Sequence, residues 1–261
     1  MTPALFLSVF AAYVLAMIGL SVWIGRRQRS GEDFLLGDRS ITLLLSLGTT
    51  VATLVGTGSS IGAVGEGYLN GWRGAMFGVG GGVGMLLLAR LFGGARRHNF
   101  MTMSEEIAFY YGANRRIKGL VAVFILLASI GWLGAHILGG SYYLAYVGGL
   151  PPVAAKATLA AAFGVYVIIG GYVAVVWTDT IQAIVLFAGF VLMAVFAVGA
   201  VGGADAFAGL AADGLDFLAG DSLLPSISLS VAIAVGVLGT PGYRQRIYSA
   251  ESTATVQKSF S

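Results

Sequence analysis

Residues 41–68 read ITLLLSLGTTVATLVGTGSSIGAVGEGY, and this stretch decides the fold. It is apolar enough to enter a lipid bilayer, and it has no charged residue before Glu66. A straight helix of this length would measure about 42 Å, whereas the hydrocarbon core is about 30 Å thick. Residues 56–60 are glycines and hydroxyl residues, which are poor helix formers because glycine costs ~1 kcal/mol and hydroxyls bond to irregular backbone. The sequence therefore predicts two half-helices that meet at mid-membrane.

Unwound backbone at that depth survives only where it lines a cavity or is buried in protein. Transporters use such interruptions to hold ions with carbonyl groups and solutes with the ends of half-helices. The alternative interpretation is one continuous, tilted helix whose glycines allow close packing on neighbouring helices. The local sequence alone leaves both interpretations open.

The composition is that of a polytopic, all-α membrane protein. Of the 261 residues, 57% are hydrophobic and only 10% are charged, whereas soluble domains carry about 25% charged residues. The chain has no cysteine, which excludes disulfides and thiol chemistry. The net charge of +3 is small, so no nucleic-acid partner is expected. Neither a Ser/His/Asp set nor an H-E-x-x-H motif is present, so we do not expect an enzyme.

The remaining apolar segments predict six further spans and a few shorter elements. A Gly-Gly pair at 170–171 is expected to break the chain between two of these spans, with Asp179 and Gln182 capping the new helix. Ser104 is expected to cap a short surface helix, and residues 202–224 are expected to include an interfacial helix. The predicted spans are 5–24, 74–92, 119–146, 153–169, 175–201 and 226–243.

The basic residues predict the orientation of these spans. Thirteen of the fifteen Lys and Arg residues fall on one side of the predicted membrane, and only Arg73 and Lys156 fall on the other. Because Lys and Arg accumulate on the cytoplasmic side, we expect a cell-membrane protein with its N-terminus outside and its C-terminus in the cytoplasm. The thirteen are Arg26, Arg27, Arg29, Arg39, Arg90, Arg96, Arg97, Arg115, Arg116, Lys118, Arg244, Arg246 and Lys258.

Four runs along the chain resemble the N-terminal part of the sodium:solute symporters. They are DFLLGDRS at 33–40, ATLVGTGS at 52–59, GGYVAVVWTDTIQ at 170–182 and GTPGYRQRIYSAES at 239–252. The third run is the most specific, because long strings interrupted by polar residues rarely recur by chance. Tyr172 within it departs from the Leu, Met or Phe that is usual in the family.

The resemblance implies a single transmembrane domain over 1–261 with an inverted-repeat transporter fold and broken core helices. The leading helix would be 4–25, the first five-helix repeat 41–201, and the first helix of the second repeat 226–243. The chain would end at Ser261 inside a loop. It would thus be an incomplete N-terminal part, and the missing C-terminal repeat is expected to be needed for function.

The resemblance also implies a function, which is sodium-coupled import of a small polar solute by alternating access across the lipid bilayer. The backbone carbonyls of Ala52 and Val55 would bind the coupling ion, Na⁺. The family also contains symporter-like sensory modules of histidine kinases, and this alternative stays open. The expected solute contacts on the two broken helices are Thr57, Gly58, Ser59 and Ser60 on the first, and Gly236, Val237 and Thr240 on the second.

His136 is a further candidate, because ionisable residues inside a membrane are often functional. The alternative is a neutral histidine that bonds to a neighbouring carbonyl, and we expect this arrangement.

The orientation can be tested with a single cysteine, since the native chain has none. Ser30 lies in the first basic loop, which the charge distribution places in the cytoplasm. A Ser30→Cys variant should therefore resist a membrane-impermeant thiol reagent in intact cells and react only after the membrane is opened. Labelling in intact cells would show that the predicted orientation is wrong.

Overall fold

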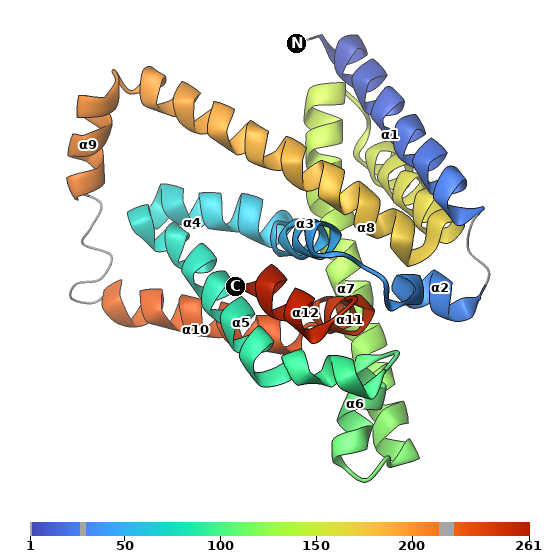
Figure 1. Cartoon of the computed structure of the whole chain (residues 1–261). Helices are drawn as coiled ribbons and strands as arrows, with labels where there is room; N and C mark the ends of the chain where they lie inside the picture. Colours follow the sequence, from blue (N-terminus) through green and yellow to red (C-terminus); the bar gives the residue numbers. More distant parts are fainter. Residues whose placement is uncertain (1, 27–29, 214–221) are drawn as a thin grey trace.

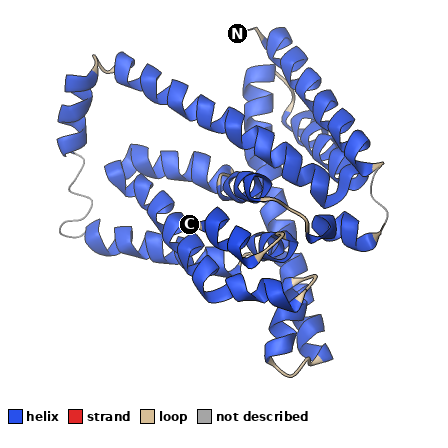
Figure 2. Ribbon diagram, in the orientation of Figure 1, coloured by secondary structure: helices blue, strands red, loops and turns tan. Residues whose placement is uncertain are grey.

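The computed structural model describes residues 2–26, 30–213 and 222–261, which form helices joined by short connections (Figure 2). No strand occurs among these residues, so the predicted all-α fold is confirmed. Within them, four helical segments are long and apolar enough to cross a membrane, and a bent helix pair adds a fifth. The four are Pro3–Gly25, Gly58–His98, Arg115–Gly148 and Pro152–Ala200. The chain is thus a multi-pass membrane protein.

The first interruption lies where the sequence predicts it. Helix α3 (Leu43–Leu54) ends because Val55 leaves the helical region, with φ −94° and ψ 92°. A single π-helical turn, η2 (Gly58–Gly62), then leads into α4 (Ala63–Asn70). The continuous-helix alternative is therefore wrong for this chain.

A second interruption divides the last predicted span. Helix α10 (Leu223–Gly239) stops at Thr240, whose ψ is 119°, and α11 (Pro241–Ser249) continues at an angle of 49°. Pro241 suits the first position of α11, because it has no amide hydrogen to leave unsatisfied there. The expected terminal loop is wrong, since residues beyond Ser252 form α12 (Thr253–Phe260). The Ser252 side chain caps this helix by accepting a hydrogen bond from Thr255 N at 3.1 Å.

The leading helix α1 (Pro3–Gly25) packs along α8 (Pro152–Ala200), which also contacts α3 and α7 (Arg115–Gly148). Figure 1 shows α8 reversing sharply, as the Gly-Gly pair predicts. The reversal occurs at Gly171, with φ 57° and ψ −160°, a conformation open to glycine alone. However, the predicted capping role of Asp179 and Gln182 is wrong. Both residues lie well inside the helical part of α8 after the kink.

The shorter elements lie between the spans. Between α1 and α3 lie α2 (Gly31–Leu36) and η1 (Gly37–Arg39). The segment after α4 comprises η3 (Gly71–Ala75), α5 (Met76–Phe92) and η4 (Gly93–His98). Thr102, rather than the expected Ser104, caps α6 (Met103–Tyr110). Helix α9 (Ala204–Asp213) covers part of the predicted interfacial segment, and residues 214–221 lie outside the described residues.

Glycines bring α5 and α10 into close contact. A Cβ atom on Gly80 would lie 2.3 Å from the carbonyl oxygen of Ser230, and one on Gly84 would lie 2.8 Å from that of Ala234. Only glycine allows the two backbones to approach this closely, which is the role expected of glycine between membrane helices. The contact places the second broken helix directly against the helix that follows the first one.

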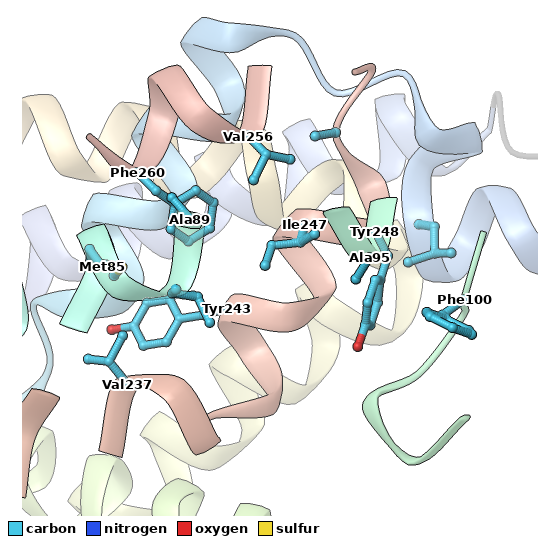
Figure 3. Close-up of a cluster of buried hydrophobic side chains, with 13 residues drawn as sticks. Met85, Ala89, Ala95, Phe100, Val237, Tyr243, Ile247, Tyr248, Val256 and Phe260 are labelled. Atoms are coloured by element: carbon cyan, nitrogen blue, oxygen red, sulfur yellow. The ribbon is translucent and has the colours of Figure 1, made fainter. Parts of the chain in front are cut away.

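A buried cluster joins α5, α10, α11 and α12 at the end of the bundle that is predicted to face the cytoplasm (Figure 3). At its edge, Arg244 Nη1 of α11 lies 2.9 Å from Glu106 Oε1 of α6, and the two side chains are 6% and 1% exposed. Tyr110 and Tyr248 also donate to the Glu106 carboxylate. The hydrophobic members are Leu36, Met85, Leu88, Ala89, Ala95, Phe100, Val237, Tyr243, Ile247, Tyr248, Ala250, Val256 and Phe260.

Two neighbouring carboxylates on α6 offer a matched test of this pair. A Glu106→Gln variant leaves the buried Arg244 charge without a counter-charge, so it should destabilise the protein by ~3–5 kcal/mol. A Glu105→Gln variant breaks an exposed pair with Lys118 and keeps an oxygen that can accept the Met101 amide, so it should cost about 0–1 kcal/mol. Thermal unfolding of the two purified variants in detergent measures the difference. Equal losses of stability would contradict this account of the buried pair.

Candidate functional site

The backbone at the first interruption is rearranged around Ser59 and Ser60. In an unbroken helix the Gly56 amide would donate to the Ala52 carbonyl, but here it donates to Ser59 Oγ at 2.8 Å. The Ser59 hydroxyl lies 3.0 Å from the carbonyl of Leu54, and the Ser60 hydroxyl donates to that of Gly56 at 2.7 Å. The Ala52 carbonyl is thereby released from its helical donor, and Val55 turns its own carbonyl out of the helix.

Helix α7 forms one wall of this interruption. The Nδ1 atom of His136 is 2.8 Å from the carbonyl oxygen of Trp132, which is the arrangement we expected for this histidine. A Cβ on Gly56 would lie 2.5 Å from His136 Nε2, and one on Gly139 would lie 2.2 Å from the Thr57 methyl group. Gly56 and Gly139 therefore let the unwound segment lie directly on α7.

The second interruption presents a hydroxyl and bare backbone. Thr240 Oγ1 donates to the carbonyl of Gly236 at 2.7 Å, and Gly236 itself is exposed. Val237 faces the opposite way, into the buried cluster beside Gly84, and is 5% exposed. The structure thus places Gly236 and Thr240 at the surface of the second interruption, whereas the Val237 side chain is part of the core.

The two interruptions meet at Thr53 and Gly242. A Cβ on Gly242 would lie 3.8 Å from the Thr53 methyl carbon and 4.0 Å from that of Thr240. Thr53 lies between the two predicted sodium ligands, Ala52 and Val55, and it was not among the predicted site residues. The inner half-helices α3 and α11 therefore come together at the level of both breaks.

Arg246 of α11 connects these half-helices to α8. Its guanidinium group donates to the Thr49 carbonyl at 3.2 Å, to Thr49 Oγ1 at 2.7 Å and to Asp179 Oδ2 at 3.2 Å. The Thr49 hydroxyl donates in turn to Asp179 Oδ2 at 2.5 Å. Arg246 and Thr49 are 7% and 0% exposed. We call Arg246, Thr49 and Asp179 the buried triad.

Tyr172 supports the same region from the kink in α8. Its hydroxyl lies 2.8 Å from Ser249 Oγ at the end of α11, and the side chain is 7% exposed. This residue departs from the family pattern, and no role was predicted for it. The hydroxyl group at this position forms a hydrogen bond between α8 and α11 that Leu, Met or Phe could not make.

The chemistry available at the two interruptions is that of neutral oxygen atoms. Carbonyl groups of unwound backbone and hydroxyl groups suit a hard cation or the polar groups of a solute. Within residues 2–26, 30–213 and 222–261, no group of three or more His, Cys, Asp or Glu side chains could hold a metal ion. The arrangement therefore offers several neutral oxygen contacts to a ligand.

Comparison with known proteins places this chain among solute transporters. It is 26% identical to the sodium/pantothenate symporter of Escherichia coli K12, over 95% of this chain and 54% of that protein. It is 29% identical to the sodium/glucose cotransporter of Vibrio parahaemolyticus, over 77% of this chain and 38% of that protein. It is 31% identical to high-affinity choline transporter 1 of Caenorhabditis elegans, over 68% of this chain and 32% of that protein.

A solved structure has the same fold. The substrate-bound, outward-open structure of a Na⁺-coupled sialic acid symporter superposes with a TM-score of 0.83, at 18% sequence identity, over 97% of this chain and 55% of that one. The chain thus spans about half the length of that protein and of the E. coli pantothenate symporter. The sequence model of the sodium:solute symporter family matches residues 34–261, and the chain belongs to that family.

Proposed function

We propose that this chain provides the ion- and solute-binding part of a sodium-coupled symporter that imports a small polar solute by alternating access. The observation that carries the proposal is the contact between two interrupted helices, α3–α4 and α10–α11, at Thr53 and Gly242. Paired interruptions at membrane depth are where transporters of this kind bind their ions and solutes.

Sodium would bind at the carbonyl oxygens of Ala52 and Val55. The released Ala52 carbonyl and the turned backbone at Val55 support this assignment, because a hard cation prefers oxygen ligands. Hard cations gather about six such ligands, so other groups must complete the shell. We propose that they come from further helices, since the E. coli pantothenate symporter is about twice as long as the matching segment.

The solute would lie over Thr57, Gly58, Ser59 and Ser60 on one side and Gly236, Val237 and Thr240 on the other. Gly58 and Gly236 are exposed and the Thr57 hydroxyl lies at the contact with α7, which supports this placement. Contact with Val237 would involve its backbone, because its side chain lies in the core. The three relatives described above are named for transport, so we favour transport over the sensory alternative.

Alternating access would move one repeat against the other around this site. Residues 41–201 would form the first repeat and α10–α11 the first helix of the second. Transport would therefore also need the remaining helices of the second repeat.

Sodium binding can be followed with a reporter cysteine at Gly58. The site is exposed, and a new Cβ there would meet nothing closer than 3.8 Å, so Gly58→Cys should be tolerated. If sodium orders the adjacent carbonyls, the rate of thiol modification should fall several-fold in sodium compared with potassium. A Tyr68→Cys variant, at a position that is 90% exposed on α4, provides the control and should react equally in both salts. Equal rates at Gly58→Cys would contradict the proposed site.

The shape of the interruption can be tested by filling the contact with α7. Gly56→Ala places a Cβ 2.5 Å from His136 Nε2, so the unwound segment must shift. We expect a loss of about 1–3 kcal/mol, as for other overpacked sites, together with loss of the sodium effect on the Gly58→Cys reporter. Gly62→Ala adds the same methyl group to open space in the same segment and should keep the effect. If both alanine variants behave alike, the contact with His136 does not shape the site.

A further inference from the structure

A pocket of about 830 Å³ lies at the foot of α7, and it contains none of the residues proposed to bind sodium or solute. Its walls come from α2 and η1, from the segment between η4 and α6, from α6 itself and from the start of α7. Helices α6 and α7 pack against each other beside it. The charged lining residues used below are Glu32, Arg39, Glu105, Arg115 and Lys118.

Among the charged side chains that line this pocket, Arg115 forms no ion pair with a described residue. Arg39 Nε lies 2.6 Å from Glu32 Oε1, and Lys118 Nζ lies 3.3 Å from Glu105 Oε1. Glu105 also accepts the Met101 amide at 2.9 Å, and this bond is the main reason why the pKa of Glu105 lies below its ordinary value. Among the described residues no acidic side chain pairs with Arg115. The pocket therefore offers a net positive charge to a ligand.

An apolar surface continues directly from the charged end of α7. Lys118, Ala122 and Leu126 follow one another at intervals of four residues, so they lie on one face of the helix. All three are exposed, and Leu126 is 59% exposed. Beside the pocket, Tyr110 and Tyr111 are 56% and 65% exposed, and tyrosines of this kind gather at the boundary between bilayer and water.

We propose that this pocket binds the headgroup of an anionic phospholipid. Arg115 and Lys118 contact its phosphate, and one acyl chain lies along Ala122 and Leu126. A basic pocket between the ends of membrane helices suits anionic lipid headgroups. The adjoining apolar face favours a lipid over a soluble anion, because only the lipid covers it. A zwitterionic lipid binds less well, since its own cation opposes Arg115.

Native mass spectrometry of the purified chain in detergent tests this proposal. The chain is titrated with phosphatidylglycerol or with phosphatidylcholine of the same acyl chains, and the retained lipid is counted. Arg115→Gln with Lys118→Gln should weaken phosphatidylglycerol binding on the order of tenfold or more. Arg97→Gln with Arg116→Gln removes the same charge from exposed residues that do not line the pocket, and should leave binding close to that of the unmodified chain.

Two further measurements separate this site from general charge attraction and from loss of folding. Arg115→Lys with Lys118→Arg keeps the charges and should retain the lipid, and melting temperatures in detergent establish that each variant is folded. Inorganic phosphate is added as a competitor and should not displace the lipid at millimolar concentration. Equal binding of the two lipids, equal losses in the two glutamine pairs, or displacement by phosphate would each overturn the proposal.

Discussion

The packing of the inner half-helices α3 and α11 against α8 depends on one buried guanidinium group, that of Arg246. Its hydrogen bonds reach Thr49 on α3, Asp179 on α8 and the Gly242 carbonyl on its own helix. A buried charge is tolerated only when it is paired and its donors are satisfied. The protein meets this requirement by bringing three helices together at one point. That point lies next to Thr53 and Gly242, where the two interruptions touch.

The interruptions themselves persist because their polar groups find local partners. The hydroxyl groups of Ser59 and Ser60 bond to the backbone that the break in α3 exposes, and Thr240 does the same at the second break. Unpaired polar groups at this depth would cost several kcal/mol each. Glycines at 56 and 139 then let α7 cover the unwound segment. The carbonyl oxygens of Ala52 and Val55 are left without helical donors, and we propose that they bind the ion.

Much of the fold could be predicted from the sequence, because its signals are local. Glycines and hydroxyl residues indicate both interruptions, and Gly170–Gly171 indicates the reversal of α8. The role of Asp179 could not be predicted in this way. Its partner Arg246 is 67 residues away in sequence, and only packing brings them together. The capping pattern of Asp179 and Gln182 is genuine as a local signal, but tertiary contact overrides it.

Other features were also missed, one of them despite a local signal. Helix α12 has a local signal, because Ser252 caps it and Val256 and Phe260 repeat at the interval of a helical turn. The prediction of a loop over this segment overlooked that signal. Thr53 carried no signal, since its proximity to Gly242 depends on how two distant helices cross. Val237 has the right position for a solute contact but faces the core, and residue position alone does not reveal which face a residue of α10 presents.

The most direct test of this account is a double-mutant cycle on the buried triad. Asp179→Asn, Arg246→Met and the double variant are purified in detergent, and the free energy of unfolding of each is compared with that of the unmodified chain. If Arg246 holds α11 to α8 through Asp179, the sum of the two single losses should exceed the loss in the double variant by about 0.5–3 kcal/mol. Losses that add within about 0.3 kcal/mol would show that the two residues act independently, and that the contact does not hold the broken helices together.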